Sequence, residues 1–172
     1  MMRKATRASG GERVCHRLPI IAVNLAHEVR TTPALGFGYV YAGCDTGRTL
    51  WQLQSSDLSR DENGEPFPQT SHKFDAPFPE DYFVGSAALT NTGNMADSVL
   101  YTGNDNGYLY ARRSRDVSLA LDTAYHLAGS RIRSTPAIAY IEDELGNLDR
   151  WVYATSAYAG GGIVAFKTDR GQ

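Results

Sequence analysis

The chain has 172 residues and a formal net charge of −2; 42% of its residues are hydrophobic and 21% are charged. Its longest apolar run, Leu18 to Val23, contains a proline, and no run approaches the roughly 18 apolar residues that a membrane-spanning helix requires. Residues 1–30 carry six basic and two acidic side chains (+4), whereas the other 142 carry 11 basic and 17 acidic ones (−6). This acidic body argues against nucleic acid as the main partner.

The first 17 residues are basic and have neither a continuous apolar h-region nor a small-residue cleavage site. They therefore lack the pattern of a signal peptide, and we interpret residues 1–17 as a flexible leader, with a targeting segment as the alternative. Residues 18–172 form the β-rich remainder. Cys15 and Cys44 could pair or remain free thiols, and the absence of a Cys-x-x-Cys motif gives no support to a structural zinc site.

A unit of similar features occurs three times along the chain. Each copy has a small Pro-Ala or Ala-Ala pair, a Tyr-containing run, a turn and a second apolar run. The pairs are Pro33-Ala34, Ala87-Ala88 and Pro136-Ala137, so the copies are offset by 54 residues (34 to 88) and 49 residues (88 to 137). Periods of about 40 to 50 residues with several short strands are typical of propeller blades. The copies lie near residues 30–83, 84–132 and 133–172.

Alternation of β-branched, aromatic and small residues predicts strands in each copy. In chain order these strands are Tyr39 to Gly43, Leu50 to Leu53, Val99 to Gly103, Tyr108 to Arg112, Trp151 to Thr155 and Ile163 to Lys167. Asp45 to Gly47 and Asn104 to Gly107 are predicted hairpin turns, because Asn, Asp and Gly tolerate positive φ. Less regular fourth strands are expected at His72 to Phe74 and Ala124 to Ala128. The best helix candidate, Val117 to Leu127, has an unconvincing apolar stripe.

The three copies resemble the repeats of the quinoprotein-like β-propellers, known as PQQ-type repeats. The resemblance covers residues 18–170. It is strongest at Arg133 to Ile138, which is similar to Arg30 to Leu35, and at Leu100 to Ala111. The second copy departs from it at Val84 to Ala88, where the Arg and Pro are missing. The resemblance implies an all-β fold, a β-propeller segment of about three four-stranded antiparallel blades.

Enzymes of that family bind a quinone cofactor and a calcium ion, with a vicinal disulfide in the central funnel. This sequence has no adjacent cysteine pair, and no Asp, Glu and Asn set matches the cofactor-binding positions. We therefore predict no catalytic, cofactor-binding or metal-binding residues and no cofactor. The resemblance then implies a non-enzymatic propeller scaffold for protein–protein interaction or assembly. Two alternatives stay open: a fragment of a PQQ-dependent dehydrogenase whose catalytic residues lie outside this chain, and a fragment of a pilus-tip-like surface adhesin.

In such a fold, Arg30 and Arg133 occupy matching positions just before two inner strands, near one mouth of the central channel. There they could bind an acidic group or a peptide carboxylate; the alternative is that they pair with acids of neighbouring blades or with solvent. Family members suggest a periplasmic or cell-surface location, which the sequence itself does not establish.

A second candidate is the proline-rich insertion from Gln54 to Pro79, whose phenylalanines are Phe67, Phe74 and Phe78. Exposed Phe-Pro pairs suit contact with a partner, and the alternative is a loop folded over the sheet edge. The expected partners are another protein or the remaining blades of a propeller.

The resemblance also gives a register for the strands. Pro19 to Leu25 would be the outer strand of a preceding blade, and the last copy stops before its own outer strand. Two chains arranged head to tail could therefore each lend Pro19–Leu25 to the other beside Ile163–Lys167, closing a six-blade homodimer. The competing explanation is a fragment of a longer propeller. Three equivalent tyrosines are expected to be buried between blades: Tyr41, Tyr101 and Tyr153.

Overall fold

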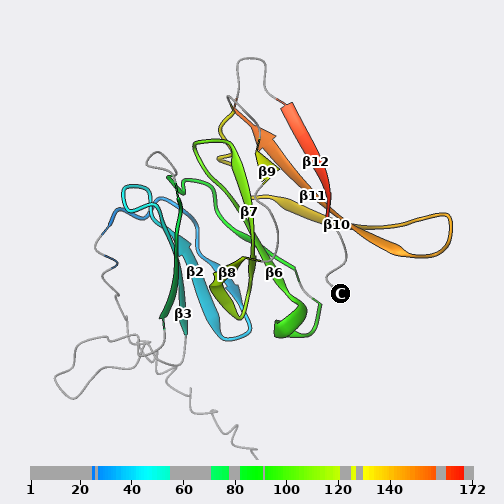
Figure 1. The fold of residues 1–172 in the computed structure, drawn as a ribbon, viewed down its shortest axis with the longest axis horizontal. Helices are drawn as coiled ribbons and strands as arrows, with labels where there is room; N and C mark the ends of the chain where they lie inside the picture. The colour runs from blue at the N-terminus through cyan, green and yellow to red at the C-terminus, as the bar shows by residue number, and fades with distance from the viewer. Residues whose placement is uncertain are drawn as a thin grey trace, which may run out of the picture.

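The computed structural model describes Leu25 and residues 27–54, 71–77, 82–90, 92–120, 125–126, 130–157 and 162–168. Within these residues the fold is all-β, with three antiparallel sheets and one short 3-10 helix. Figure 1 shows the three sheets succeeding one another across the molecule in chain order. No helix of the described ranges has the length and apolarity to cross a membrane. The expected all-β class is therefore confirmed.

The first sheet is a four-stranded meander in the order β1-β2-β3-β4. Its strands are β1 (Ala34–Gly36), β2 (Tyr39–Gly43), β3 (Thr49–Gln54) and β4 (Ser71–Asp75). The strand predicted at His72 to Phe74 is confirmed as β4. In the β1–β2 turn both Phe37 (φ 51°) and Gly38 (φ 78°) have positive φ, which matches the right-handed twist of a tight hairpin.

The second sheet has the order β5-β6-β7-β8, with β9 also paired to β7. Its elements are β5 (Ala88–Leu89), η2 (Met95–Asp97), β6 (Val99–Gly103), β7 (Tyr108–Arg113), β8 (Asp116–Ala120) and β9 (Tyr125–His126). The helix candidate at Val117 to Leu127 is wrong in its described part, which belongs to β8 and β9. Both strands pair with β7, and these pairings outweigh a weak helical pattern.

The third sheet has the order β10-β11-β12. Its strands are β10 (Ala137–Glu142), β11 (Leu148–Ser156) and β12 (Gly162–Thr168). The hairpin between β10 and β11 projects away from the other two sheets in Figure 1. The strands predicted from Trp151 and from Ile163 are confirmed, each slightly longer than expected.

One apolar core lies between the first and second sheets. Its buried members are Tyr41, Leu50, Phe74, Ala76, Phe83, Leu100, Tyr110 and Val117. Polar groups cross the same boundary: Tyr41 Oη and Gln52 Nε2 donate to the backbone oxygen of Ser114 at 2.6 and 2.8 Å. Val117 N–H donates to Gln52 Oε1 at 3.0 Å. The buried Gln52 amide therefore has hydrogen-bond partners, as a buried polar group requires.

A second apolar core lies between the second and third sheets. Its buried members are Val99, Tyr101, Leu109, Ala111, Ile132, Val152 and Ala154. Residues of β6 alternate between the two cores, because successive side chains of a strand point to opposite faces. The second sheet is thus covered on both faces. The predicted burial is confirmed for Tyr41 and Tyr101, whereas Tyr153 is only half-buried.

Candidate functional site

An extended segment leads into each sheet just before its first strand, and we call these the lead-in segments. They are residues 28–33, 82–87 and 131–136. The backbone N–H of Thr32 donates to the Ser86 hydroxyl at 2.7 Å, which joins the first segment to the second. A Cβ on Gly85 would lie 3.0 Å from the backbone of Arg133, which places the second segment against the third. The lead-in segments of successive sheets are therefore neighbours in space.

An equivalent backbone hydrogen bond ties each lead-in segment to the turn after the second strand of its own sheet. The bonds run from Asp45 N to Glu28 O (2.9 Å), from Asp105 N to Tyr82 O (3.0 Å) and from Ala157 N to Arg131 O (2.9 Å). A hydroxyl adds a second tie in two sheets: Thr31 and Ser134 accept from the N–H groups of Gly43 and Thr155, both at 3.0 Å. In the second copy Gly85 takes this position, because the third segment leaves little room for a side chain there.

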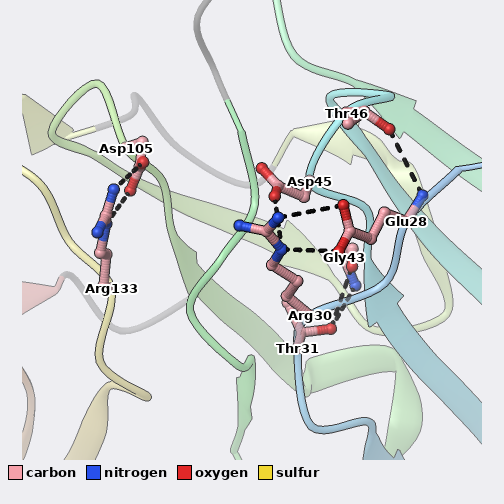
Figure 2. A network of polar contacts seen from close by, with 8 residues as sticks. All are labelled: Glu28, Arg30, Thr31, Gly43, Asp45, Thr46, Asp105 and Arg133. Atoms are coloured by element: carbon pink, nitrogen blue, oxygen red, sulfur yellow. Dashed lines mark hydrogen bonds and ion pairs between the residues drawn. The ribbon is translucent and has the colours of Figure 1, made fainter.

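The arginines predicted as a binding site are both paired with carboxylates (Figure 2). Arg30 Nε donates to Glu28 at 3.0 Å and lies 3.0 Å from Asp45 Oδ2. Arg133 donates to the Asp105 carboxylate from two nitrogens, Nε and Nη2, at 2.6 and 2.5 Å. Bidentate geometry of this kind is the strongest form of such a pair. Of the two alternatives from the sequence, pairing with neighbouring acids is the arrangement that the structure contains.

The two pairs differ in what they connect. Asp45 and Asp105 stand at matching places, each two residues after a buried glycine at the end of a second strand. Arg30 binds the acid of its own sheet, whereas Arg133 reaches back to the acid of the preceding sheet. The hydrogen bond that Arg30 donates to Glu28 raises the pKa of Arg30, and the hydrogen bond that Arg133 donates to Asp105 raises the pKa of Arg133. Both guanidinium groups therefore stay charged.

The charged rim formed by Glu28, Arg30, Asp45, Asp105 and Arg133 holds three carboxylates against two guanidinium groups. Both carboxylates of Asp45 and Asp105 are mostly buried, whereas both arginines are exposed. An acidic ligand would have to compete with these carboxylates for the guanidinium nitrogens. The rim is thus better suited to holding the lead-in segments in place than to binding an anion.

Apolar plugs join successive sheets. Phe83 and Ile132 are fully buried and each presses on a glycine of the preceding sheet. A Cβ added to Gly43 would lie 2.6 Å from the Phe83 Cβ atom, and one added to Gly103 would lie 2.2 Å from Ile132 Cγ2. Real Cβ atoms do not approach other heavy atoms so closely, so each plug requires the glycine beneath it. We call Phe83 and Ile132 the plug residues; no pattern in the sequence singles them out.

The third sheet carries an apolar face directed away from the second sheet, and we call this the outer face. Its register places Tyr153 opposite Ala165, and Thr155 opposite Ile163. Trp151 and Tyr153 are half-buried, and Ile163 is 75% exposed. The opposite face of the sheet packs on the second core. The equivalence of Tyr153 to two buried tyrosines was visible in the sequence, but its exposure was not.

The structure corrects the prediction that Phe74 belongs to a partner-contact loop. It lies in β4, in the first core, with its ring 5.1 Å from that of Tyr110. The guanidinium carbon of Arg112 lies 3.2 Å from the Phe74 ring centroid, a cation–π arrangement. Phe74 is therefore core rather than contact surface; Phe67 and Phe78 lie outside the described residues.

Several other predicted features involve residues that lie partly or wholly outside the described ranges. Cys44 is a buried free thiol, and burial raises its pKa; Cys15 lies outside the described ranges. So does Pro19–Leu25 apart from its last residue, which leaves the strand-lending homodimer a prediction.

The ranges that the structure covers contain no group of three or more His, Cys, Asp or Glu placed to hold a metal ion. No protein-family model matches the chain, and no curated protein is significantly similar to it.

Proposed function

We propose that the three sheets are blades of a PQQ-type β-propeller segment, and that the chain is a non-enzymatic scaffold for protein–protein interaction or assembly. The observation that carries the proposal is the repetition of one interface. Phe83 seals the first sheet against the second as Ile132 seals the second against the third, each over a glycine. Repeating units that contact only their neighbours in this way are the principle of repeat architectures.

The lead-in segments support the assignment to a propeller. In a propeller the first strands of successive blades are arranged around a common axis. Here the lead-in segments are adjacent through the Thr32–Ser86 hydrogen bond and the Gly85–Arg133 contact. The charged side chains at this rim pair with one another and hold those segments in place. The Arg133–Asp105 pair crosses between two sheets and would fix the angle between those blades.

The interaction surface of the proposed scaffold is the outer face of the third sheet. The exposed large apolar residues of this face are Ile141 and Ile163, which the strand pairings place on the same face as Trp151 and Tyr153. Exposed apolar surface marks sites of protein interaction. The half-buried rings of Trp151 and Tyr153 add aromatic area, and aromatic residues are enriched in interface cores.

Photo-crosslinking tests this function. A photoreactive phenylalanine analogue replaces Ile163 in the full chain, which is produced in its native host and irradiated there. The matched control carries the analogue at Leu145, which is 86% exposed but belongs to the β10–β11 turn. We expect position 163 to give discrete protein adducts that position 145 does not. Equal, diffuse labelling from both positions would contradict a scaffold that works through this face.

A further inference from the structure

The side chains at matched positions on one face are buried in the first two sheets, whereas in the third sheet they are partly or largely exposed. Tyr41 and Tyr101 are buried by the next sheet, whereas Tyr153 is half-buried. The strand pairings also match Leu50, Leu109 and Ile163, which lie opposite Gly43, Gly103 and Thr155. Leu50 and Leu109 are buried, but Ile163 is 75% exposed. The outer face of the third sheet therefore has the composition of an inter-sheet interface without its cover.

The complementary face shows the same pattern at the other end of the molecule. The plug position holds Phe83 and Ile132, both fully buried, and in the first copy Val29, which is 41% exposed. Six residues further along are Leu89 and Ile138, which pack against the two cores, and Leu35, which is 73% exposed. Val29 and Leu35 thus form a second uncovered half-interface, which we call the plug face.

We propose that the outer face of the third sheet binds the plug face of a second copy of this chain, head to tail. The inference rests on the proposed function, since it extends the interface between blades to a contact between chains. The occupant follows from continuity with the two interfaces inside the chain. Both halves of a third interface of the same kind are present and uncovered, and one chain cannot supply both to itself if its sheets run in an arc.

The residue beneath the plug differs in this contact. Inside the chain, a plug as large as Phe83 or Ile132 sits on a glycine that tolerates no Cβ. At the matched place on the outer face stands Thr155, which brings a side chain of its own. The atoms that crowd the two glycines include the Cβ atoms of Phe83 and Ile132, and valine also has a Cβ. Val29 must therefore lie farther from the outer face than the plugs lie from their glycines.

The charges fit this contact. Arg133, beside the plug Ile132, needs Asp105 of the preceding sheet. In the contact between chains the matched positions are Arg30 and Ala157, so the outer face offers no carboxylate to that arginine. None is required, because Glu28 and Asp45 already bind Arg30. The interface closes without leaving a buried unpaired charge, which would be costly.

A head-to-tail contact joins different surfaces of the two chains and therefore forms a ring or a filament. Two chains of three sheets give six sheets, within the range of about four to eight blades that closed propellers have. We therefore expect a closed dimer of twice the 18.8 kDa chain.

The first experiment measures mass by light scattering over a concentration series of the full chain. Val29→Asp and Ile163→Asp each place a charge in one half-interface, and each should weaken dimerisation at least about tenfold. Leu145→Asp is the control and should leave the mass unchanged. An equimolar mixture of the two variants should recover dimer, since one of its two interfaces is then intact. A monomer at all concentrations, or a dimer indifferent to both variants, overturns the proposal.

A second experiment does not depend on the effect of a charge. In a Cys15→Ser background, Val29→Cys and Thr155→Cys chains are mixed and mildly oxidised; Cys44 is buried and stays in place. The mixture should give an interchain disulfide that the Val29→Cys chain alone does not. Cross-linking of the Val29→Cys chain alone to the same extent as the mixture, or no cross-linking in either, would contradict a head-to-tail arrangement.

The adducts from position 163 separate this inference from the proposed function. Adducts with a second copy near Val29 support both. Adducts with another protein, or with other sequence of a longer chain, would leave the scaffold in place and overturn the second copy as occupant. The lack of discrete adducts contradicts both.

Discussion

Ile132 lies over Gly103 at the boundary between the second and third sheets, so closely that a Cβ on the glycine would be 2.2 Å from Ile132 Cγ2. The same relationship joins Phe83 to Gly43 one sheet earlier, at 2.6 Å. Two positions that are far apart in the sequence thus depend on each other in each interface. This dependence is what makes the stacking of the sheets specific.

Gly103→Ala should lower the free energy of unfolding by about 1–3 kcal/mol, because the added methyl group overpacks the contact with Ile132. Gly162→Ala is the matched control, since a Cβ there would meet nothing within 4 Å. Urea unfolding of both variants is the measurement. Ile132→Ala should cost less in the Gly103→Ala background than in the parent chain, because it removes the clash with Cγ2 but not those with the Ile132 Cβ and backbone oxygen. Equal effects of the two glycine variants would contradict the plug.

Truncating the equivalent tyrosines should separate the three positions. Tyr41→Ala and Tyr101→Ala remove fully buried rings and should each cost about 3 kcal/mol or more. Tyr153→Ala should cost clearly less in the monomer, because its ring is only half-buried. Thermal or urea unfolding at low protein concentration gives the comparison. A Tyr153 loss as large as the other two would show that its face is covered.

Most strands and the burial of Tyr41 and Tyr101 could be predicted from the sequence, whereas the exposure of Tyr153 could not. The bounds of β2 and β6 follow from residue alternation and from the turns after them. In the second of these, Gly107 takes a φ of 81° and the Asn104 side chain accepts from Tyr108 N–H at 2.6 Å. The same alternation is present in the third copy, yet it does not reveal whether another sheet covers Tyr153.

Contacts between residues far apart in the chain also could not be predicted from the sequence. Arg30 and Arg133 have similar neighbours in the chain, but one binds the acid of its own sheet and the other that of the sheet before it. That choice depends on the angle between sheets, which no local pattern encodes. Phe74 was assigned to a contact loop because prolines surround it, and β4 pairing with β3 placed it in the core instead.

The Arg133–Asp105 pair should contribute modestly to stability. Arg133 is about half exposed, and exposed ion pairs are worth about 0–1 kcal/mol even with good geometry. A double-mutant cycle with Arg133→Gln and Asp105→Asn should give a coupling in that range, and it should shrink at high salt. Coupling of several kcal/mol that ignores salt would mean that the pair is buried in solution.

The chain should bind no quinone cofactor. The sequence has no adjacent cysteine pair and no ligand set that matches the family's cofactor-binding positions. We expect titration with pyrroloquinoline quinone and calcium to show no binding at micromolar concentrations, and no oxidation of alcohols or sugars with an artificial acceptor. Calcium-dependent quinone binding at such concentrations would favour a piece of a dehydrogenase instead.

The free energy of unfolding at alkaline pH should depend on the buried Tyr41 hydroxyl, which donates to the backbone oxygen of Ser114. Burial raises the pKa of Tyr41 well above its usual value near 10, so the folded state keeps a proton that the unfolded chain releases. The unfolded chain therefore binds fewer protons above about pH 10, and the Tyr41 contribution, fully present below that pH, declines as pH rises. Tyr41→Phe should reduce the fall in unfolding free energy between pH 9 and pH 11. If the Tyr41→Phe variant keeps the full fall, Tyr41 is not held protonated against Ser114.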